Sequence, residues 1–138
     1  MKKFEENIPK AVAALRKYKV VNSVGEYEKQ YNGYISAFGA SVMQSGLLPT
    51  IVFYSSDKGA TATRSLLLKV LLEIRAESAP AGYDVSNMYH LVTTGVASAP
   101  QANIMTELSN QDRKKIERDL LQNAIAMKLA LRLFKPVA

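Results

Sequence analysis

Apolar positions near the N-terminus follow the period of an α-helix. In residues 4–18 they recur three or four residues apart and so lie on one side of a predicted helix. Pro9 complicates this pattern, because a proline inside a helix removes a backbone donor and clashes with the preceding turn. We therefore expect a helix over residues 3–21 that either begins near Ile8 or bends there.

A second amphipathic pattern runs from Tyr27 to Val42 and is the clearest helix of the chain. Ser23 is expected to cap this helix, and Gly46 is expected to end it. Its apolar side includes four aromatic residues: Tyr27, Tyr31, Tyr34 and Phe38. Aromatic rings can stack on nucleobases, but this side is the only apolar face of the helix. We therefore interpret the rings as part of the core.

The middle of the chain predicts three more helices. Residues 47–54 have the propensity of a strand, but Pro49 suits the first turn of a helix and the flanking segments are helical, which favours a short helix. A leucine-rich helix is expected over residues 60–77, and a short helix is expected over residues 86–96. Loops are expected at residues 78–82 and 97–100.

The last predicted helix runs from Ser109 to about Lys135, with Ser109 as its N-cap. One apolar side of this helix carries Ile116, Leu120, Met127, Leu131 and Phe134. The opposite side carries Leu121, Ile125 and Leu129. A helix with two apolar sides needs two neighbours. Because no segment of the chain repeats, the whole pattern predicts an all-α fold, a compact bundle of five to seven helices in a single domain over residues 1–138.

The positive charge of the chain is concentrated at its two ends. With 18 Lys and Arg against 12 Asp and Glu, the net charge is +6. Residues 1–19 and 109–138 each carry +4, whereas residues 20–108 carry −2. The start of the last helix holds four cations: Arg113, Lys114, Lys115 and Arg118. The helix dipole disfavours positive charge there, so fold stability does not explain them. They indicate either a phosphate-binding surface or a solvated face that gives solubility.

Composition argues against several classes of protein. Without cysteine the chain has no disulfides, thiolate nucleophiles or sulfur-rich metal sites, which fits a cytoplasmic protein. No apolar run is long enough to cross a bilayer. Glu5 and Glu6 also stand where a secretory signal needs apolar residues. We therefore expect neither secretion by that route nor a membrane span.

Catalytic chemistry has little support in the sequence. His90 is the only histidine and has no acid at helical spacing, so we interpret it as a structural or surface residue rather than a general base. The carboxylates Glu73 and Glu77 lie beside basic residues and are interpreted as partners in surface ion pairs. A single histidine without cysteine cannot form a typical zinc site, and neither glycine-rich phosphate-binding motif is present. We expect no enzymatic activity, no metal and no cofactor.

Several segments together resemble one known family. The run QSGLLPTIVFY at residues 44–54 follows a tyrosine-bearing helix and resembles the small helical subunit of the type III-B CRISPR RNA-guided effector, the Cmr small subunit. In that family such a helix ends in a turn that is followed by an apolar helix. The leucine-rich helix over residues 64–74 and the closing helix over residues 123–134 continue the likeness.

The resemblance implies a non-catalytic subunit of a larger assembly. In such complexes, copies of the small subunit stack along larger backbone subunits that hold the CRISPR RNA, and together they line the groove in which target RNA pairs. The implied partners are other subunits of the effector complex, copies of this chain, CRISPR RNA and target RNA. Stacking would use the second apolar side of the last helix, so three residues are candidate subunit contacts: Leu121, Ile125 and Leu129.

Charge clustering, rather than the resemblance, selects the candidate RNA-binding residues. They are Lys10, Lys17, Lys19, Lys58, Arg64, Lys69, Arg113, Lys114, Lys115 and Arg118. These residues predict a salt-dependent affinity for RNA with little sequence preference. An alternative stays open: a helical adaptor module that binds protein partners without contacting nucleic acid. A third hypothesis, an enzyme with a site at His90, has the least support.

Overall fold

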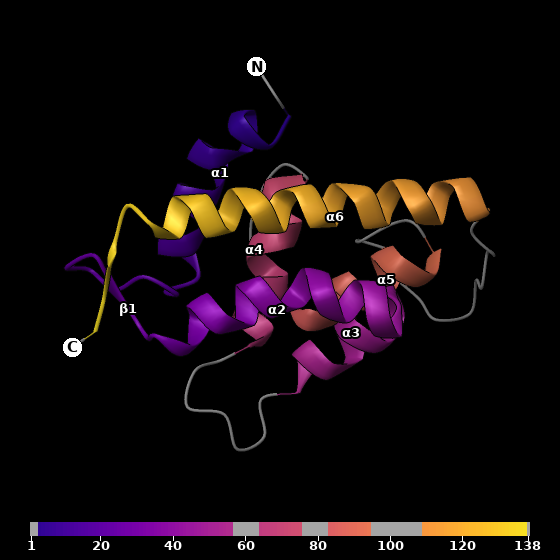
Figure 1. Cartoon of the computed structure of the whole chain (residues 1–138), viewed down its shortest axis with the longest axis horizontal. Helices are drawn as coiled ribbons and strands as arrows, with labels where there is room; N and C mark the ends of the chain where they lie inside the picture. The colour runs from indigo at the N-terminus through magenta and orange to yellow at the C-terminus, as the bar shows by residue number, and fades with distance from the viewer. Residues whose placement is uncertain (1–2, 57–63, 76–82, 95–108, 138) are drawn as a thin grey trace.

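The computed structural model describes residues 3–56, 64–75, 83–94 and 109–137 of the chain. In these residues it contains six helices and two short strands (Figure 1). The helices are α1 (Lys3–Lys17), α2 (Gln30–Ser45), α3 (Leu47–Ser55), α4 (Ser65–Arg75), α5 (Val85–Thr94) and α6 (Asn110–Leu131). The strands β1 (Glu26–Tyr27) and β2 (Lys135–Pro136) form one parallel pair. The predicted all-α class is therefore confirmed, with a very small sheet added.

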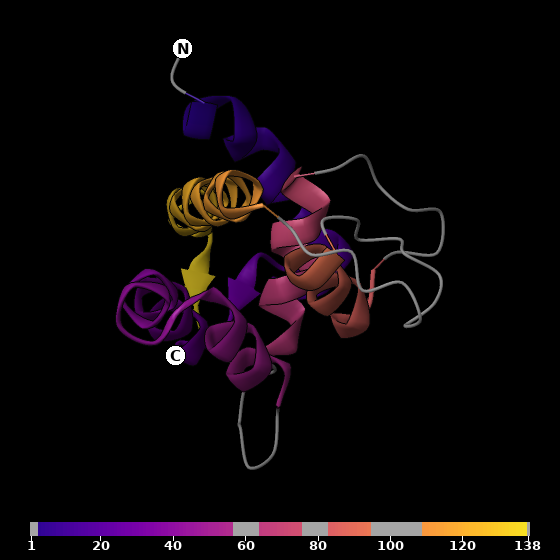
Figure 2. The same cartoon turned by 90° about the vertical axis from the view of Figure 1, so that its right-hand side faces the viewer.

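The helices form two layers. Helices α2 and α6 lie side by side and antiparallel in one layer, and α4 and α5 lie behind them (Figures 1 and 2). Helix α1 begins above α6 in these views and crosses to the layer behind it. Helix α4 is central and contacts α1, α3, α5 and α6. Helix α6 is the longest, with 22 residues, and contacts α1, α2 and α4. These three neighbours leave one long side of α6 facing solvent.

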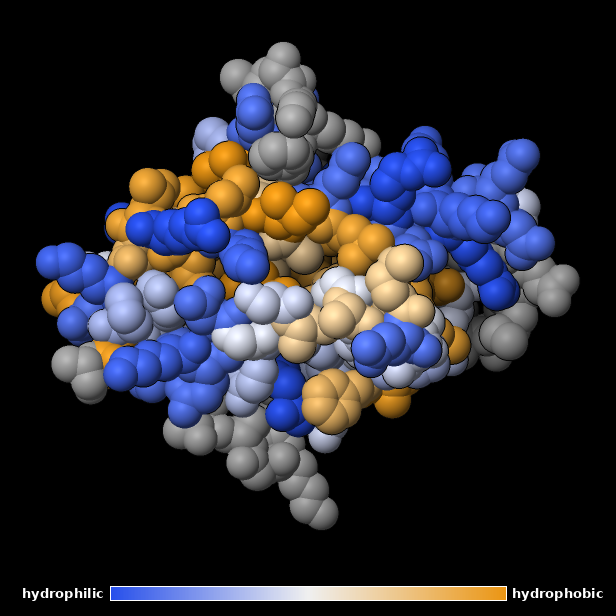
Figure 3. Space-filling model, viewed as in Figure 1, coloured by the Kyte–Doolittle hydropathy of each residue, from blue (hydrophilic) through white to orange (hydrophobic). Residues whose placement is uncertain are grey.

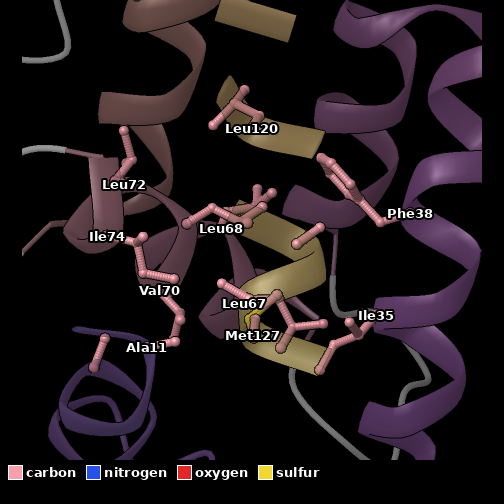
Figure 4. Packing of buried hydrophobic residues seen from close by; sticks show 14 of the residues in the cluster. Ala11, Ile35, Phe38, Leu67, Leu68, Val70, Leu72, Ile74, Leu120 and Met127 are labelled. Atoms are coloured by element: carbon pink, nitrogen blue, oxygen red, sulfur yellow. The ribbon is translucent and has the colours of Figure 1, made fainter. Parts of the chain in front are cut away.

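The core is built around α4 because this helix is apolar on almost every side. Seven of its 11 residues are buried, among them Leu67 and Leu68. Phe38 from α2 and Leu120 from α6 belong to the same cluster (Figure 4). The predicted aromatic stripe also lies in the core, with three buried rings and one half-buried ring: Tyr27, Tyr31, Phe38 and, half-buried, Tyr34.

The first helix begins at the start of its predicted range, residues 3–21, and ends earlier than predicted. Helix α1 starts at Lys3 and includes Pro9, so a start near Ile8 is wrong. Pro9 lies on the exposed side of the helix, where a carbonyl that loses its backbone partner can bond to water. The helix stops at Lys17 because Lys19 adopts a left-handed backbone conformation with a φ of 61°.

The segment between α1 and α2 forms a turn and a strand instead of the start of a helix. The side chain of Asn22 accepts hydrogen bonds from the backbone N–H groups two and four residues later, at 3.0 and 2.9 Å. Gly25 supports this turn with a φ of 82°. Such local hydrogen bonds compete with a helix. Helix α2 consequently begins at Gln30, and the predicted start at Tyr27 with a cap at Ser23 is wrong.

The C-terminal segment leaves its helix to pair with β1. Helix α6 ends at Leu131, short of its predicted end. Beyond it, the Lys135 N–H donates to the Gly25 carbonyl at 3.0 Å, and the Val137 N–H donates to the Tyr27 carbonyl at 2.8 Å. These hydrogen bonds join the last described residues to the segment that precedes α2.

The remaining helix predictions agree with the structure. Gly46 ends α2 with a φ of 94°, a conformation that glycine adopts without strain. Helix α3 forms despite the strand propensity of its residues, and Pro49 lies in its first turn. Helices α4 and α5 overlap their predicted ranges. Ser109 caps α6, since its side chain accepts from the Asp112 N–H at 3.1 Å. The loops expected at residues 78–82 and 97–100 lie outside the described residues.

Candidate nucleic-acid interface

The exposed side of α6 gathers three cations around an open depression near its N-terminus. The depression has a volume of about 460 Å³ and is lined by Gln111, Lys114, Lys115, Arg118, Asp119 and Gln122. After Gln111, the other lining residues follow at intervals of 3, 4, 7, 8 and 11 positions along the helix. This spacing places all of them on one side of the helix. Figure 3 shows the hydrophilic surface at this end of α6. Three of the four cations predicted to cluster at the start of this helix, Lys114, Lys115 and Arg118, therefore lie around one depression.

The depression carries an excess of positive charge. Among the described residues, Lys114, Lys115 and Arg118 form no ion pair. Asp119 instead pairs with Arg75 of α4 at 3.6 Å, which compensates the charge of its carboxylate. The free N–H groups in the first turn of a helix add a partial positive charge. An anion placed here would meet cations that the described protein groups do not neutralise.

Towards the C-terminus the exposed side of α6 becomes apolar. Ile125, two turns after the last of these cations, is 48% exposed, and Leu129 is half-buried. Leu121 lies closer to α2, since its side chain comes within 3.8 Å of the position that a Cβ on Gly39 would occupy. Of the three predicted subunit contacts, Ile125 therefore offers the most surface.

One further apolar residue extends this surface. Leu133, just after α6, is 70% exposed. Leu133 is not among the predicted subunit contacts, although its spacing of eight residues from Ile125 is a helical spacing. Figure 3 shows apolar residues gathered along the C-terminal half of α6. We call the exposed side the α6 strip, which consists of Lys114, Lys115, Arg118, Ile125, Leu129 and Leu133.

Two buried asparagines hold α1 against α6. The Asn7 side chain donates from Nδ2 to Oδ1 of Asn123 at 2.9 Å, and Nδ2 of Asn123 donates to the Leu71 carbonyl at 3.3 Å. Asn7 is 8% exposed and Asn123 is 2% exposed. Because buried amides need hydrogen-bond partners, this chain of contacts sets the positions of α1, α4 and α6 relative to one another.

The predicted RNA-binding cations of α1 lie apart from the basic depression. In addition to the asparagine contact, the Arg16 guanidinium lies 5.1 Å from the ring centre of Phe134, beyond the end of α6. Helix α1 thus packs along the C-terminal half of α6. Lys10 is exposed on this helix and Lys19 is exposed just after it. The structure therefore does not join these two cations with those of α6.

Lys17 is engaged in a polar cluster between α1 and α4. Its Nζ donates to both carboxylate oxygens of Glu73, at 3.1 and 3.2 Å, and the Tyr18 hydroxyl donates to the same carboxylate at 2.8 Å. The hydroxyl in turn accepts from the Tyr83 backbone N–H at 2.9 Å. Burial, together with the Glu73 carboxylate, raises the pKa of Tyr18 to about 12. Glu73 forms the ion pair that the sequence predicted, whereas Glu77 lies outside the described residues.

Arg64 contacts aromatic rings rather than facing solvent alone. Its guanidinium carbon lies 4.6 Å from the ring centre of Phe53 and 5.7 Å from that of Tyr34. The guanidinium also donates to the Ser56 carbonyl. Cations over aromatic faces are stabilised by the quadrupole of the ring. Arg64 therefore links three helices, which charge clustering in the sequence could not indicate.

The other predicted cations are not brought to the depression. Arg113 is exposed but does not line it. Lys69 is half-buried on α4. The pKa of the exposed Asp84 carboxyl is lowered mainly by a hydrogen bond from the Ser86 side chain, and Lys69 adds a smaller effect in the same direction. Lys58 lies outside the described residues.

The described residues offer few other sites for chemistry. His90 is half-buried on α5, with its ring centre 6.1 Å from that of Tyr89. In the described part of the chain, no three His, Cys, Asp or Glu residues are grouped so that they could hold a metal. Within the same residues, no helix combines the length and the apolar character needed to cross a membrane. The α6 strip is therefore the strongest candidate site.

Comparisons with known proteins identify a family. Neither the comparison with curated proteins nor the comparison with solved structures gives a significant match. The model of the family described as CRISPR-associated protein (Cas_Cmr5) matches residues 8–130. This range includes α2 to α5, most of α1 and nearly all of α6, and it agrees with the helical resemblance seen in the sequence. The chain belongs to this family and is a Cmr small subunit of a type III-B CRISPR complex.

Proposed function

We propose that this subunit has no catalytic activity of its own and that the basic half of the α6 strip lies against the RNA bound by the effector complex. Guide RNA and target RNA recognise each other by base pairing, so the protein needs no contacts to base edges. The subunit supplies positive charge and shape along the phosphate backbone. Its contribution to antiviral defence is to stabilise the paired RNA in the groove of the complex.

A single observation carries this proposal. Lys114, Lys115 and Arg118 meet on one exposed side of α6, and no described residue forms an ion pair with them. Like charges four residues apart destabilise a helix, and so do cations near its N-terminus. An anionic backbone that binds here removes both effects. Lys10 and Lys19 are further candidates, because both side chains are exposed.

The apolar half of the α6 strip suits contact with a neighbouring copy of the subunit. Ile125 and Leu133 are 48% and 70% exposed, and burying apolar surface of this kind favours association. Leu121 and Leu129 would border the contact. Copies that stack here would bring their basic halves into a row along one RNA, which links the protein contact to the RNA contact.

The test reverses the charge of the three cations of the depression in the assembled, guide-loaded complex. The variant Lys114→Glu, Lys115→Glu, Arg118→Glu is expected to bind target RNA more weakly. Titrations between about 50 and 200 mM salt should give a slope of log K against log salt that is shallower by about 2 to 3, because three phosphate contacts are lost. Fluorescence anisotropy with labelled target RNA measures both quantities.

A matched control separates the site from the overall charge. The variant Lys29→Glu, Arg132→Glu, Lys135→Glu changes three exposed cations outside the depression and also moves the net charge from +6 to 0. It is expected to keep the wild-type slope. Equal weakening by both variants, or wild-type binding by the α6 variant, would overturn the proposal.

A further inference from the structure

Helix α3 is apolar on all sides, yet one side of it faces solvent. Its buried side holds Thr50, Ile51 and Tyr54. Its exposed side, which we call the α3 face, consists of Leu48, Pro49, Val52 and Phe53. The exposed fraction is 57% for both Val52 and Phe53. Because a helix that is apolar all round is typical of one surrounded by protein, the α3 face has the composition of a surface that is covered.

The α3 face lies in a part of the chain without charge. Residues 30–56 contain none of the 18 basic and 12 acidic side chains. Met43 of α2 is 76% exposed and Tyr89 of α5 is 47% exposed, and both helices contact α3. The centres of protein interfaces are poor in charge and rich in aromatic residues and methionine, whereas RNA binding depends on Lys and Arg. The composition of this region therefore fits a protein partner.

A second copy of this chain is a poor partner for the α3 face. Residues 30–56 contain no acidic side chain, so the same face of a second copy offers no carboxylate to a cation at the edge of this one. A different partner with acidic side chains can supply that carboxylate.

A cation lies at the edge of the α3 face, beside the largest side chain of that face. The Arg64 guanidinium lies over the Phe53 ring at 4.6 Å and donates to the Ser56 carbonyl, and a guanidinium has five N–H donors in all. Aromatic and arginine side chains dominate the binding energy of many interfaces. We infer that the α3 face docks into an apolar groove, bordered by carboxylates, on a different subunit of the effector complex. Phe53 fills the groove and Arg64 pairs with a carboxylate at its rim.

The test measures how much of this chain stays with the complex. The full-length chain is co-expressed with the other subunits, the complex is purified through a tag on another subunit, and the amount of this chain per complex is quantified. Phe53→Glu is expected to reduce its retention about tenfold or more, as for loss of a central anchor residue. Val52→Glu, which leaves the Phe53 and Arg64 contact in place, is expected to reduce retention in the same direction.

Controls distinguish this contact from unfolding and from RNA binding. Val24→Glu makes the same change at an apolar side chain that is 74% exposed outside α3, and it is expected to be retained like the wild type. Circular dichroism of each purified chain checks that it is folded. The charge-reversed α6 variant should stay in the complex and lose only RNA affinity, so the two proposals can fail separately.

Three results would overturn the inference. The first is wild-type retention of both α3 variants. The second is a dimer of the isolated chain, seen by sedimentation, that Phe53→Glu dissociates, because the occupant is then a second copy. The third is full retention of the α3 variants in the complex together with weaker RNA binding, because the occupant is then RNA.

Discussion

The α6 strip and the α3 face expose apolar side chains in opposite electrostatic settings. On α6, Ile125 follows three cations along one side of the helix. On α3, Phe53 lies within residues 30–56, where no side chain is charged. Binding through the α6 strip should weaken as salt rises, because phosphate contacts release counterions. Binding through the α3 face should depend on apolar area and respond little to salt. The two proposals therefore assign two kinds of contact to one small chain.

The two helices are also held in place by different interactions. Helix α3 is held by aromatic packing, because the ring centre of Tyr54 lies 5.4 Å from that of Phe38 and its hydroxyl donates to the Tyr34 carbonyl at 2.6 Å. Helix α6 is held in part by the amide contact between Asn7 and Asn123. A substitution behind one surface should therefore affect that surface more than the other.

The largest effect is expected behind the α3 face. Tyr54 is 2% exposed, so Tyr54→Ala should lower the free energy of unfolding by about 3–5 kcal/mol, the cost of removing a buried ring. Tyr54→Phe keeps the ring and loses only its hydrogen bond, at about 1 kcal/mol. Urea unfolding followed by circular dichroism measures both values. Equal losses in the two variants would show that aromatic packing does not hold α3.

A smaller effect is expected behind the α6 strip. Asn123→Ala leaves Asn7 and the Leu71 carbonyl without their buried partner and should cost about 1–3 kcal/mol of unfolding free energy. In the assembled complex it should weaken RNA binding more than subunit retention. Gln111→Ala removes an exposed amide from the same helix and should change stability by no more than about 0.5 kcal/mol. A cost for Asn123→Ala as small as that of Gln111→Ala would contradict the role of the asparagine pair.

The smallest effect is a difference in alkaline stability. Burial raises the pKa of Tyr54 above its ordinary value of 10.0. The folded state therefore holds this proton more tightly than the unfolded state, and the resulting stability is complete below pH 10 and is lost as the pH rises through the folded pKa. Helix α6 contains no tyrosine, so this loss of stability at high pH is expected behind α3 and not behind α6.

Urea unfolding at about pH 9 and pH 11 tests whether stability falls as the pH rises, as this pKa shift predicts. The wild type should lose more stability over that interval than Tyr54→Phe does. Tyr18 and Tyr83 also have raised pKa values, but they titrate in both proteins, so the difference isolates Tyr54. Equal losses would mean that the Tyr54 proton does not contribute.

Most of the helices could be predicted from the sequence because each has a local signal. The period of apolar residues predicts α2 and α6, and Pro49 favours a helix where the propensity of α3 suggests a strand. The turn at Asn22 and the pairing of β1 with β2 could not be predicted, since both depend on hydrogen bonds that have no periodic pattern. Local period therefore predicts where helices lie better than where they begin and end.

The candidate site was predictable only where its residues are neighbours on one helix. Lys114 and Lys115 precede Arg118 by four and three residues, so their common side follows from the sequence. The ion pair of Lys17 could not be predicted in this way, because its carboxylate partner Glu73 lies 56 residues away in the sequence. The exposure of the α3 face could not be predicted either. In the sequence its apolar residues are indistinguishable from core residues, because nothing there shows which side of the helix faces solvent.

The pairing of β1 with β2 has a consequence for the order of folding. Glu26 and Lys135 lie near opposite ends of the chain, so closing the loop between them costs more entropy than two paired residues recover. The strands can pair only after packing of the helices has brought these ends together, because non-local contacts are slow to form. The small sheet therefore forms late and closes the end of the bundle, while the nucleus of folding lies among the helices.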